Sequence, residues 1–169
     1  DNQLNGNIPL EIWDLTDLNI LWLHNNLLNG EISSKVENLI NVRELSLYNN
    51  QLSGEIPSEV WGLPNVTHLH LSNNSFTGEI PSLVEELSTV HFLYLNDNNF
   101  TGEIPSEIGS LTNLFGLLLN GNQLTGVISD QVCNPDYIEI NIGDNKLCPP
   151  YPDCISQGDI DSQDTSNCP

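Results

Sequence analysis

The chain has 169 residues, with 23 Asp and Glu against 3 Lys and Arg, so its formal net charge at pH 7 is −20. A nucleic-acid-binding protein needs a basic surface to displace the counterions of phosphate, and an anionic membrane repels an acidic protein, so both partners are disfavoured. No segment approaches the ~20 consecutive apolar residues of a membrane-spanning helix, so we expect no direct insertion into a bilayer.

A repeat of 24 residues runs along most of the chain. Asparagine recurs at this interval, and a glycine and an isoleucine follow it each time at fixed distances. The recurring positions are Asn2, Asn26, Asn50, Asn74, Asn98 and Asn122, then Gly6, Gly30, Gly54, Gly78, Gly102 and Gly126, then Ile8, Ile32, Ile56, Ile80, Ile104 and Ile128. One period shared by several classes of position indicates a solenoid, because each coil buries its apolar side chains only by stacking on the next.

Each position of the repeat has a physical interpretation. Pairs such as Leu45 and Leu47 alternate with other residues, which predicts a short strand with both leucines facing inward. Asn50 then falls at an inward-turning position, where its amide must hydrogen-bond to backbone groups. Gly54 permits a tight turn, and Pro57 ends the stretch because proline cannot donate to a sheet ladder.

The pattern resembles the plant-type leucine-rich repeat, LxxLxxLxLxxNxLxGxIPxxLgxL, and the stretch from Leu63 to Pro81 carries it in full. Relatives with this repeat include receptor ectodomains, polygalacturonase-inhibiting proteins and secreted bacterial leucine-rich-repeat proteins. The resemblance implies an α/β repeat solenoid. Its right-handed superhelix would have a parallel β-sheet on the concave side, a short second sheet, and 3₁₀ turns on the convex side.

The expected domains are a solenoid over residues 1–147 and a disulfide-bonded cap with a polar tail over residues 148–169. The last repeat is shorter than the others, since Asn145 follows Asn122 after 23 residues. The first repeat is truncated, because residues 1–4 enter it in its middle without a preceding apolar strand or cysteine cap. An uncapped end exposes core leucines to water, so we expect a longer parent chain or self-association at this end.

The positions that alternate with the inward leucines face outward on the predicted concave sheet, where stacking aligns equivalent residues in columns. Aromatic and histidine side chains gather in the first four repeats, and exposed aromatics rimmed by polar groups are typical of recognition surfaces. The predicted anchors are Trp22, Tyr48, His68, His70, Phe92 and Tyr94. Glu44 and Asp97 are expected to supply polar selectivity toward a protein or peptide, and a glycan remains an alternative ligand.

Two histidines on one predicted strand, His68 and His70, point the same way, with Glu44 one coil away. Two imidazoles and a carboxylate can hold Zn or Fe. Surface histidine at a variable position is the favoured interpretation, so no metal site is assigned. Protonation of both histidines near pH 6 would modulate ligand binding.

A row of glutamates, Glu31, Glu55, Glu79 and Glu103, fills the position after each glycine. Like charges in adjacent coils repel one another, so a bound Ca²⁺ or a basic partner would stabilise them. The alternative is that water and salt screen the row. This row motivates a second hypothesis for the function, an acidic, Ca²⁺-responsive structural or adhesion spacer.

All four cysteines, Cys133, Cys148, Cys154 and Cys168, lie in the last 37 residues. An even number of cysteines outside the repeat indicates disulfides and an oxidising compartment, and the absence of a C-x-x-C knuckle disfavours zinc. The resemblance to plant repeat caps implies a short Cys148–Cys154 bridge, which leaves Cys133–Cys168. The pairing Cys133–Cys148 with Cys154–Cys168 is the alternative.

No catalytic motif of the G-x-S-x-G or H-E-x-x-H type occurs, and the glycines are spaced by the repeat instead of clustered into a phosphate loop. The sequence therefore predicts a non-catalytic recognition module without a cofactor. We expect it to be secreted or displayed at the cell surface and to bind a protein or peptide through the concave face. The spacer and a glycan-binding module are the alternatives.

Overall fold

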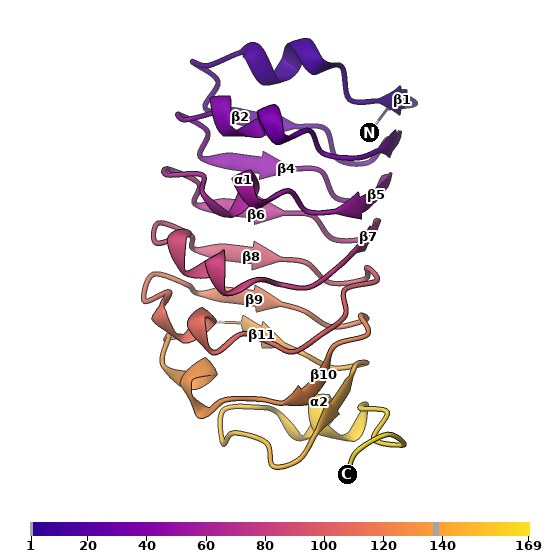
Figure 1. Cartoon of the computed structure of the whole chain (residues 1–169), viewed down its shortest axis with the longest axis vertical. Helices are drawn as coiled ribbons and strands as arrows, with labels where there is room; N and C mark the ends of the chain where they lie inside the picture. The colour runs from indigo at the N-terminus through magenta and orange to yellow at the C-terminus, as the bar shows by residue number, and fades with distance from the viewer. Residues whose placement is uncertain (1, 137–138) are drawn as a thin grey trace.

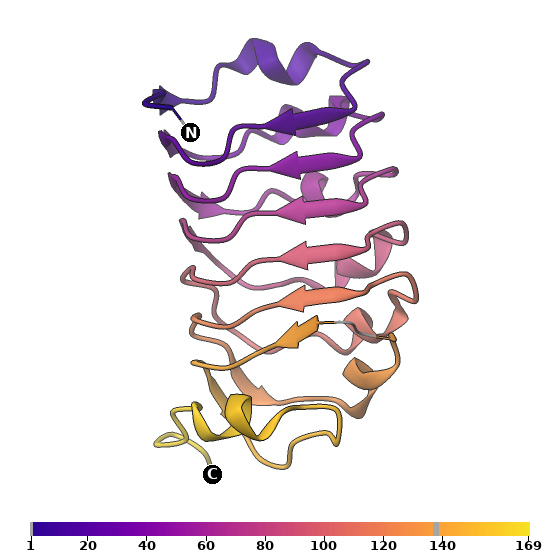
Figure 2. The same ribbon diagram turned by 180° about the vertical axis from the view of Figure 1, so that it is seen from behind.

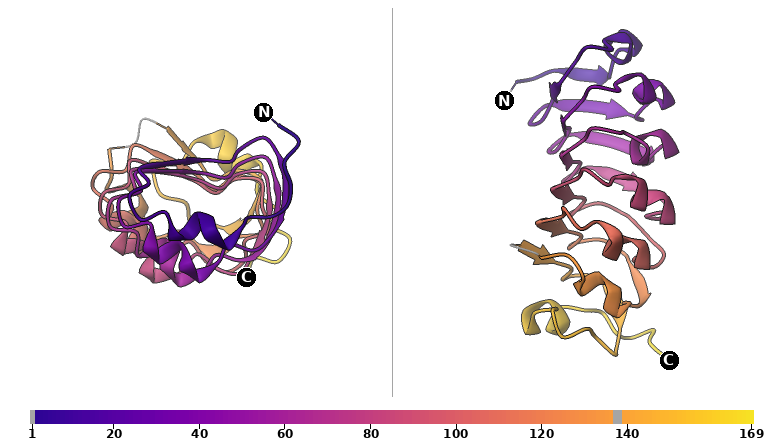
Figure 3. Two further views of the ribbon diagram at one scale, coloured as in Figure 1. Left: turned by 90° about the horizontal axis from the view of Figure 1, so that it is seen from above. Right: turned by 90° about the vertical axis from the view of Figure 1, so that its left-hand side faces the viewer.

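The computed structural model describes residues 2–136 and 139–169. These residues wind into a stack of coils, with the N-terminal and C-terminal coils at opposite ends (Figure 1). Short helical turns lie on one side of the stack, and the reverse view in Figure 2 shows the strands of a continuous sheet on the other. Seen along the stack, each coil is a flattened ring (Figure 3). The predicted solenoid is confirmed.

The concave side is a six-stranded parallel sheet in the order β11-β9-β8-β6-β4-β2. Neighbouring strands pair residues one repeat apart, for example Glu44 with His68, so the sequence repeat becomes the register of the sheet. The last pair joins Gly116 to Glu139, one residue closer in sequence, as the shorter last repeat requires. The strands are β2 (Ile20–Trp22), β4 (Glu44–Ser46), β6 (His68–His70), β8 (Phe92–Tyr94), β9 (Gly116–Leu118) and β11 (Glu139–Asn141).

The predicted second sheet is also present, beside the recurring glycines. Four strands pair in the order β1-β3-β5-β7, and β10 pairs with β12 near the C-terminus. Single bridges from Glu79 to Thr101 and from Glu103 to Thr125 continue the ladder between these two groups. The strands are β1 (Asn5–Asn7), β3 (Leu27–Gly30), β5 (Gln51–Glu55), β7 (Ser75–Thr77), β10 (Thr125–Val127) and β12 (Lys146–Cys148).

The convex side carries one short helical turn in each coil. The third coil has a single α-helical turn, α1 (Ser58–Trp61), and the C-terminal segment has a second one, α2 (Gln157–Asp161). The other convex turns are 3₁₀, as predicted: η1 (Leu10–Asp14), η2 (Ser34–Asn38), η3 (Ser82–Glu86), η4 (Ser106–Ser110) and η5 (Asp130–Cys133).

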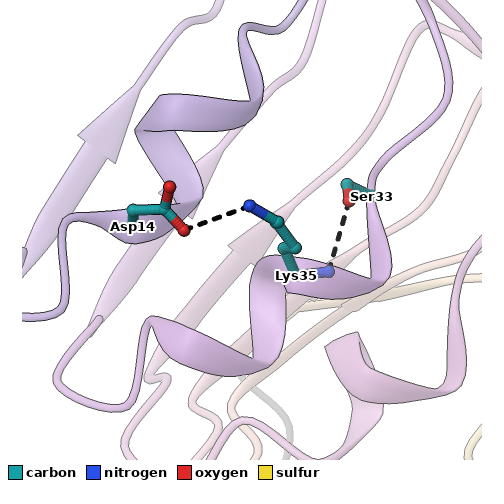
Figure 4. A network of polar contacts seen from close by, with 3 residues as sticks. All are labelled: Asp14, Ser33 and Lys35. Carbon is teal, nitrogen blue, oxygen red and sulfur yellow. Dashed lines mark hydrogen bonds and ion pairs between the residues drawn. The ribbon is translucent and has the colours of Figure 1, made fainter.

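Proline precedes most of these turns, and serine replaces it before η2 and η5. The hydroxyl of Ser33 accepts a hydrogen bond from the backbone N–H of Lys35, so a side-chain cap stands where proline is missing (Figure 4). The ammonium of Lys35 also reaches Asp14 of the preceding coil at 3.3 Å (Figure 4). Both side chains are about half exposed, so this ion pair contributes ~1 kcal/mol or less to stability.

The predicted asparagine ladder joins the coils. Asn98 donates to the carbonyl oxygens of Leu71 and Leu95, both at 3.1 Å, and its Oδ1 accepts from the N–H of Phe76 at 3.0 Å. Leu71 and Phe76 belong to the preceding coil, so each asparagine ties its own coil to the one before. Equivalent bonds are made by Asn26, Asn50, Asn74, Asn122 and Asn145.

The two disulfides join Cys133 to Cys154 and Cys148 to Cys168, so both pairings expected from the sequence are wrong. Cys148 ends β12 on the side of the second sheet, and the chain then crosses to η5, where residues 151–153 lie beside Cys133. The tail returns to the last coil, where the N–H of Asp164 donates to the carbonyl of Asn145. Each bridge therefore closes a long loop, whereas the resemblance suggested a local one.

The C-terminal segment covers the last coil with polar as well as apolar contacts. Asp159 is buried, and its carboxylate accepts from the backbone N–H of Gly143 at 3.1 Å and from the hydroxyl of Ser156 at 2.8 Å. Gln163 donates to the carbonyl of Ile142 and accepts from the N–H of Leu147. The first coil differs, because it exposes several large apolar side chains: Leu4, Leu10, Leu15 and Ile20.

Candidate recognition surface on the concave sheet

The outward side chains of the six-stranded sheet form the columns that the repeat predicted. One column holds Trp22, Ser46, His70, Tyr94, Leu118 and Asn141. Its neighbour holds Ile20, Glu44, His68, Phe92, Gly116 and Glu139. Strand pairing thus brings residues that are far apart in the sequence onto one surface, and the face is richest in rings over β2 to β8.

In the described part of the chain, pairwise contacts link nine rings into one connected set, which we call the aromatic array. Tyr48 stacks on His24 and on His70, with ring centroids 4.6 Å and 4.1 Å apart, and His70 meets Tyr94 edge-on at 5.1 Å. All four histidines of the chain belong to the array. Its members are Trp22, His24, Tyr48, His68, His70, His91, Phe92, Tyr94 and Phe115.

A hollow of about 120 Å³ opens in the middle of this surface, and we call it the Ser46 hollow. Six of the eight predicted site residues line it, together with Ser46 and Leu69. The small side chain of Ser46 lies between Trp22 and His70 in their column, which leaves room for the hollow. Its predicted lining residues are Trp22, Glu44, His68, His70, Phe92 and Tyr94.

The two other predicted site residues lie outside the hollow. Tyr48 contributes through its stack on His70. Asp97 is exposed in the loop after β8, in the left-handed region with φ of 54°, and accepts a hydrogen bond from the side chain of Asn96. The structure therefore places Asp97 at the rim of the concave face and does not bring it together with the rings around Ser46.

Of the described residues, Glu44 is the one carboxylate that lines the Ser46 hollow. Its Oε2 accepts a hydrogen bond from Nε1 of Trp22 at 3.0 Å, which holds the indole across the neighbouring strand. Trp22 is otherwise 59% exposed, so this bond and the contact with His24 fix an aromatic side chain that faces solvent. The carboxylate of Glu44 and the indole of Trp22 therefore lie side by side at the hollow.

Gly116 and Glu139 are parts of the surface that the sequence analysis did not select. A Cβ on Gly116 would lie 2.6 Å from Cδ1 of Phe92 and 3.1 Å from Tyr94, so only glycine leaves room for both rings. The hydroxyl of Tyr94 crosses β9 and donates to Oε2 of Glu139 at 3.2 Å. Burial, and then the charge of Glu139, raise the pKa of Tyr94. Gly116 and Glu139 occupy the same column as Phe92, so the repeat could have identified both as parts of this surface.

His70 has a strongly lowered pKa. Burial, and then the nearby His24, lower the pKa of His70 to about 4. The expectation that His70 is protonated near pH 6 is therefore wrong, since it stays neutral there. His68 is hydrogen-bonded through Nδ1 to the hydroxyl of Thr67 at 2.9 Å. In the described part of the chain, no three His, Cys, Asp or Glu side chains are grouped closely enough to hold a metal ion.

The glutamate row on the second sheet has a packing role. A Cβ on Gly78, where φ is 85°, would lie 2.9 Å from Cγ of Glu55, so the glutamate stem lies against the glycine of the next coil. The same arrangement places Glu79 over Gly102. Left-handed backbone already favours glycine at these positions, and the contact with the preceding glutamate gives a second reason for it.

Comparison with family models identifies the repeat directly. A model of two copies of the leucine-rich repeat matches residues 40–85, and a model of a single leucine-rich repeat matches residues 89–111. Neither model describes a catalytic family. No curated protein sequence matches the chain significantly. No helix in the described residues combines the length and hydropathy needed to cross a membrane.

Solved structures extend the likeness to most of the chain. The Arabidopsis receptor kinase HAESA, solved in complex with the peptide hormone IDA and the co-receptor SERK1, is 34% identical with a TM-score of 0.83, over 86% of this chain and 25% of that one. A plant ice-binding protein shares the fold at 24% identity, with a TM-score of 0.63 over 90% of this chain and 73% of that one.

The chain spans only 18–31% of the length of the receptor ectodomains that it matches first. A chain of the BIR3–SERK2 complex of Arabidopsis thaliana is comparable in size. It is 33% identical, with a TM-score of 0.67 over 80% of this chain and 73% of that one. The repeat, the coil geometry and this identity agree, and the chain belongs to the leucine-rich-repeat family.

Proposed function

We propose that the chain is a non-catalytic recognition module that binds a protein or peptide through its concave face. The observation that carries the proposal is the Ser46 hollow within the aromatic array. Large rings such as Trp22, which is 59% exposed, contribute much contact area and are enriched where proteins bind one another. A surface that served only to complete the sheet would not need a connected set of rings around a hollow.

Rigidity supports the same function. The asparagine ladder and the stacked coils hold the array in place, and Glu44, Tyr48 and Glu139 fix individual rings through the contacts described above. A surface whose side chains are already ordered loses little conformational entropy when a ligand binds. The geometry therefore suits recognition without a large rearrangement.

The relatives support this class of ligand. The HAESA structure contains a peptide hormone and a co-receptor, and another relative was solved in a complex of two named proteins. The disulfides Cys133–Cys154 and Cys148–Cys168 are typical of an oxidising compartment. We therefore place the proposed module outside the cell, secreted or displayed at the surface.

Selection from a displayed library of random peptides tests the proposal. The chain is immobilised, and enriched peptides are measured against Trp22→Ala and Tyr94→Ala, which change the concave face. Leu83→Ala removes an exposed apolar side chain from the convex turn η3 and is the matched control. We expect the two concave variants to lose binding while the control keeps it. No enrichment, or equal binding by all three variants, would refute concave recognition.

A further inference from the structure

The size of the Ser46 hollow limits what it accepts. Its volume of about 120 Å³ is far below the ~300–1,000 Å³ of pockets that enclose a whole small molecule. It corresponds to ~4 water molecules at their share of liquid volume, about 30 Å³ each. The hollow therefore fits the end of one side chain that projects from a ligand lying along the concave face.

The lining favours a cation. Glu44 supplies a carboxylate. Of its two oxygens, only Oε2 is hydrogen-bonded to another described residue, so Oε1 is available to a ligand. The rings of Trp22, Phe92 and Tyr94 line the walls, and the faces of such rings attract positive charge. Among the residues that the structure describes, no Lys or Arg lines the hollow. One acidic group and several aromatic faces thus surround the same small volume.

His70 does not oppose a cation at neutral pH. Burial and the neighbouring His24 lower its pKa to about 4, so the imidazole carries no charge in the conditions where a ligand would bind. It is also held by Tyr48 on one side and Tyr94 on the other. His70 therefore acts as a neutral aromatic wall.

The charge of the whole chain adds a long-range contribution. A formal net charge of −20 attracts basic ligands and raises their rate of encounter. Among cationic side chains, the guanidinium of arginine is planar, is more weakly hydrated than an ammonium, stacks on aromatic faces, and can form paired hydrogen bonds with a carboxylate. A hollow with aromatic walls and one glutamate therefore suits an arginine side chain better than a lysine side chain.

We propose that the Ser46 hollow is a subsite for an arginine side chain of a basic peptide, with Glu44 as the charged partner and the surrounding rings as the stacking walls. This inference rests on the proposed function, since it names the chemistry of the ligand for the same face. Lysine and leucine are the competing occupants, and the experiment below separates them.

The peptides selected in the library experiment provide the probes. The arginine that affects affinity most in the best peptide is replaced in turn by citrulline, lysine and leucine, and each peptide is titrated against the unchanged chain. Citrulline keeps the shape of arginine and removes its charge. We expect citrulline and leucine to weaken binding about tenfold, the size of one charge-assisted hydrogen bond.

Glu44→Gln tests the partner within the chain, and Glu37→Gln on the convex turn η2 removes the same charge elsewhere as a control. We expect Glu44→Gln to weaken the arginine peptide about tenfold and the citrulline peptide little, while Glu37→Gln changes neither. The double-mutant cycle isolates the pair from any general effect of charge.

Two kinds of failure are distinguishable. If selected peptides depend on Trp22 and Tyr94 but contain no essential arginine, or bind Glu44→Gln as tightly as the unchanged chain, the arginine subsite is wrong and concave recognition stands. Equal binding of the leucine peptide would make the hollow an apolar subsite. If no peptide depends on the concave face, the proposed function fails and the subsite fails with it.

Discussion

The ring of Phe92 occupies space that any side chain larger than hydrogen at Gly116 would need, since a Cβ there would lie 2.6 Å from Cδ1 of Phe92. The two residues pair across β8 and β9 in the concave sheet. This contact shows how a position without a side chain shapes the aromatic array. It also explains why the ring of Tyr94 can cross β9 and reach Glu139.

Gly116→Ala should displace both rings. We expect a loss of about 1–3 kcal/mol in the free energy of unfolding, as for overpacking in a close-packed site, together with weaker binding of peptides that depend on Tyr94. Gly62→Ala is the control, because a Cβ there meets its nearest atom, the carbonyl oxygen of Glu59, at an ordinary 3.8 Å. Chemical denaturation measures both. Similar losses for the two variants would contradict the steric explanation.

The asparagine ladder should carry a large share of the stability of each coil. Asn98→Ala removes the side-chain acceptor of the Phe76 N–H, whereas the carbonyls of Leu71 and Leu95 each keep a second donor, from Asn74 and Asn122. An unsatisfied buried polar group costs ~1–3 kcal/mol, so we expect the free energy of unfolding to fall by about that amount.

The neighbouring Asn99 is exposed and provides the matched control. Asn99→Ala should change the free energy of unfolding by no more than about 0.5 kcal/mol, as is usual for surface substitutions. Denaturant titrations of both variants, followed by circular dichroism, give the comparison. Equal effects would mean that the ladder bonds contribute no specific stabilisation.

The repeat positions made the fold and the concave columns predictable from the sequence. Leu45, Asn50 and Gly54 each have one local role, and the 24-residue interval converts these roles directly into the sheet register. The disulfide pairing was not predictable in this way. Cys133 and Cys148 lie where the repeat ends, so no periodic rule states which side of the last coil each following segment reaches.

At the recognition surface, the lengths and directions of the side chains likewise could not be predicted from the repeat. The columns place Tyr94 beside His70 and Leu118, but they do not state that its hydroxyl extends two strands along to Glu139. Asp97 was selected for its charge, and the loop after β8 directs it to the rim. Backbone periodicity therefore predicts which residues share a face, whereas rotamers and neighbours decide which of them meet.

Peptide mapping should find the bridges Cys133–Cys154 and Cys148–Cys168. Proteolysis of the unreduced chain followed by mass spectrometry identifies the joined fragments. The bridges span 21 and 20 residues. The loop-entropy relation gives about 3 kcal/mol for each, so we expect Cys148→Ser with Cys168→Ser to lower stability by about that amount. A Cys148–Cys154 fragment would overturn the pairing.

Calcium should leave the melting temperature unchanged. The glutamate row lies against the glycines of adjacent coils, as Glu55 does on Gly78, and no described group of three acidic or histidine side chains converges. Ca²⁺ needs 6–8 oxygen ligands, so we expect the same melting curve in EDTA and in about 5 mM CaCl₂, a concentration that occupies weak extracellular sites. A rise of several degrees would instead support the calcium-responsive spacer.

The low pKa of His70 gives the stability a specific pH dependence. The pKa of His70 is about 4 in the folded chain and 6.5 for a free side chain, so the unfolded chain takes up the proton first as the pH falls. The stability supplied by neutral His70 is therefore complete above about pH 6.5 and is lost progressively as the pH falls toward 4. The other titratable groups around His70 are Tyr48 and Tyr94, which contact its ring, Glu44 and His68, which line the same hollow, and His24, whose charge contributes to the low pKa of His70.

His70→Phe keeps a ring between Tyr48 and Tyr94 and removes the proton site. We expect the free energy of unfolding of the variant to fall less steeply than that of the unchanged chain between about pH 6.5 and pH 4, because only the unchanged chain binds an extra proton at residue 70 on unfolding. Denaturant titrations at several pH values measure both slopes, and NMR follows the His70 imidazole directly. Parallel slopes, or titration of His70 near its usual pKa, would mean that burial in the array does not hold this ring neutral.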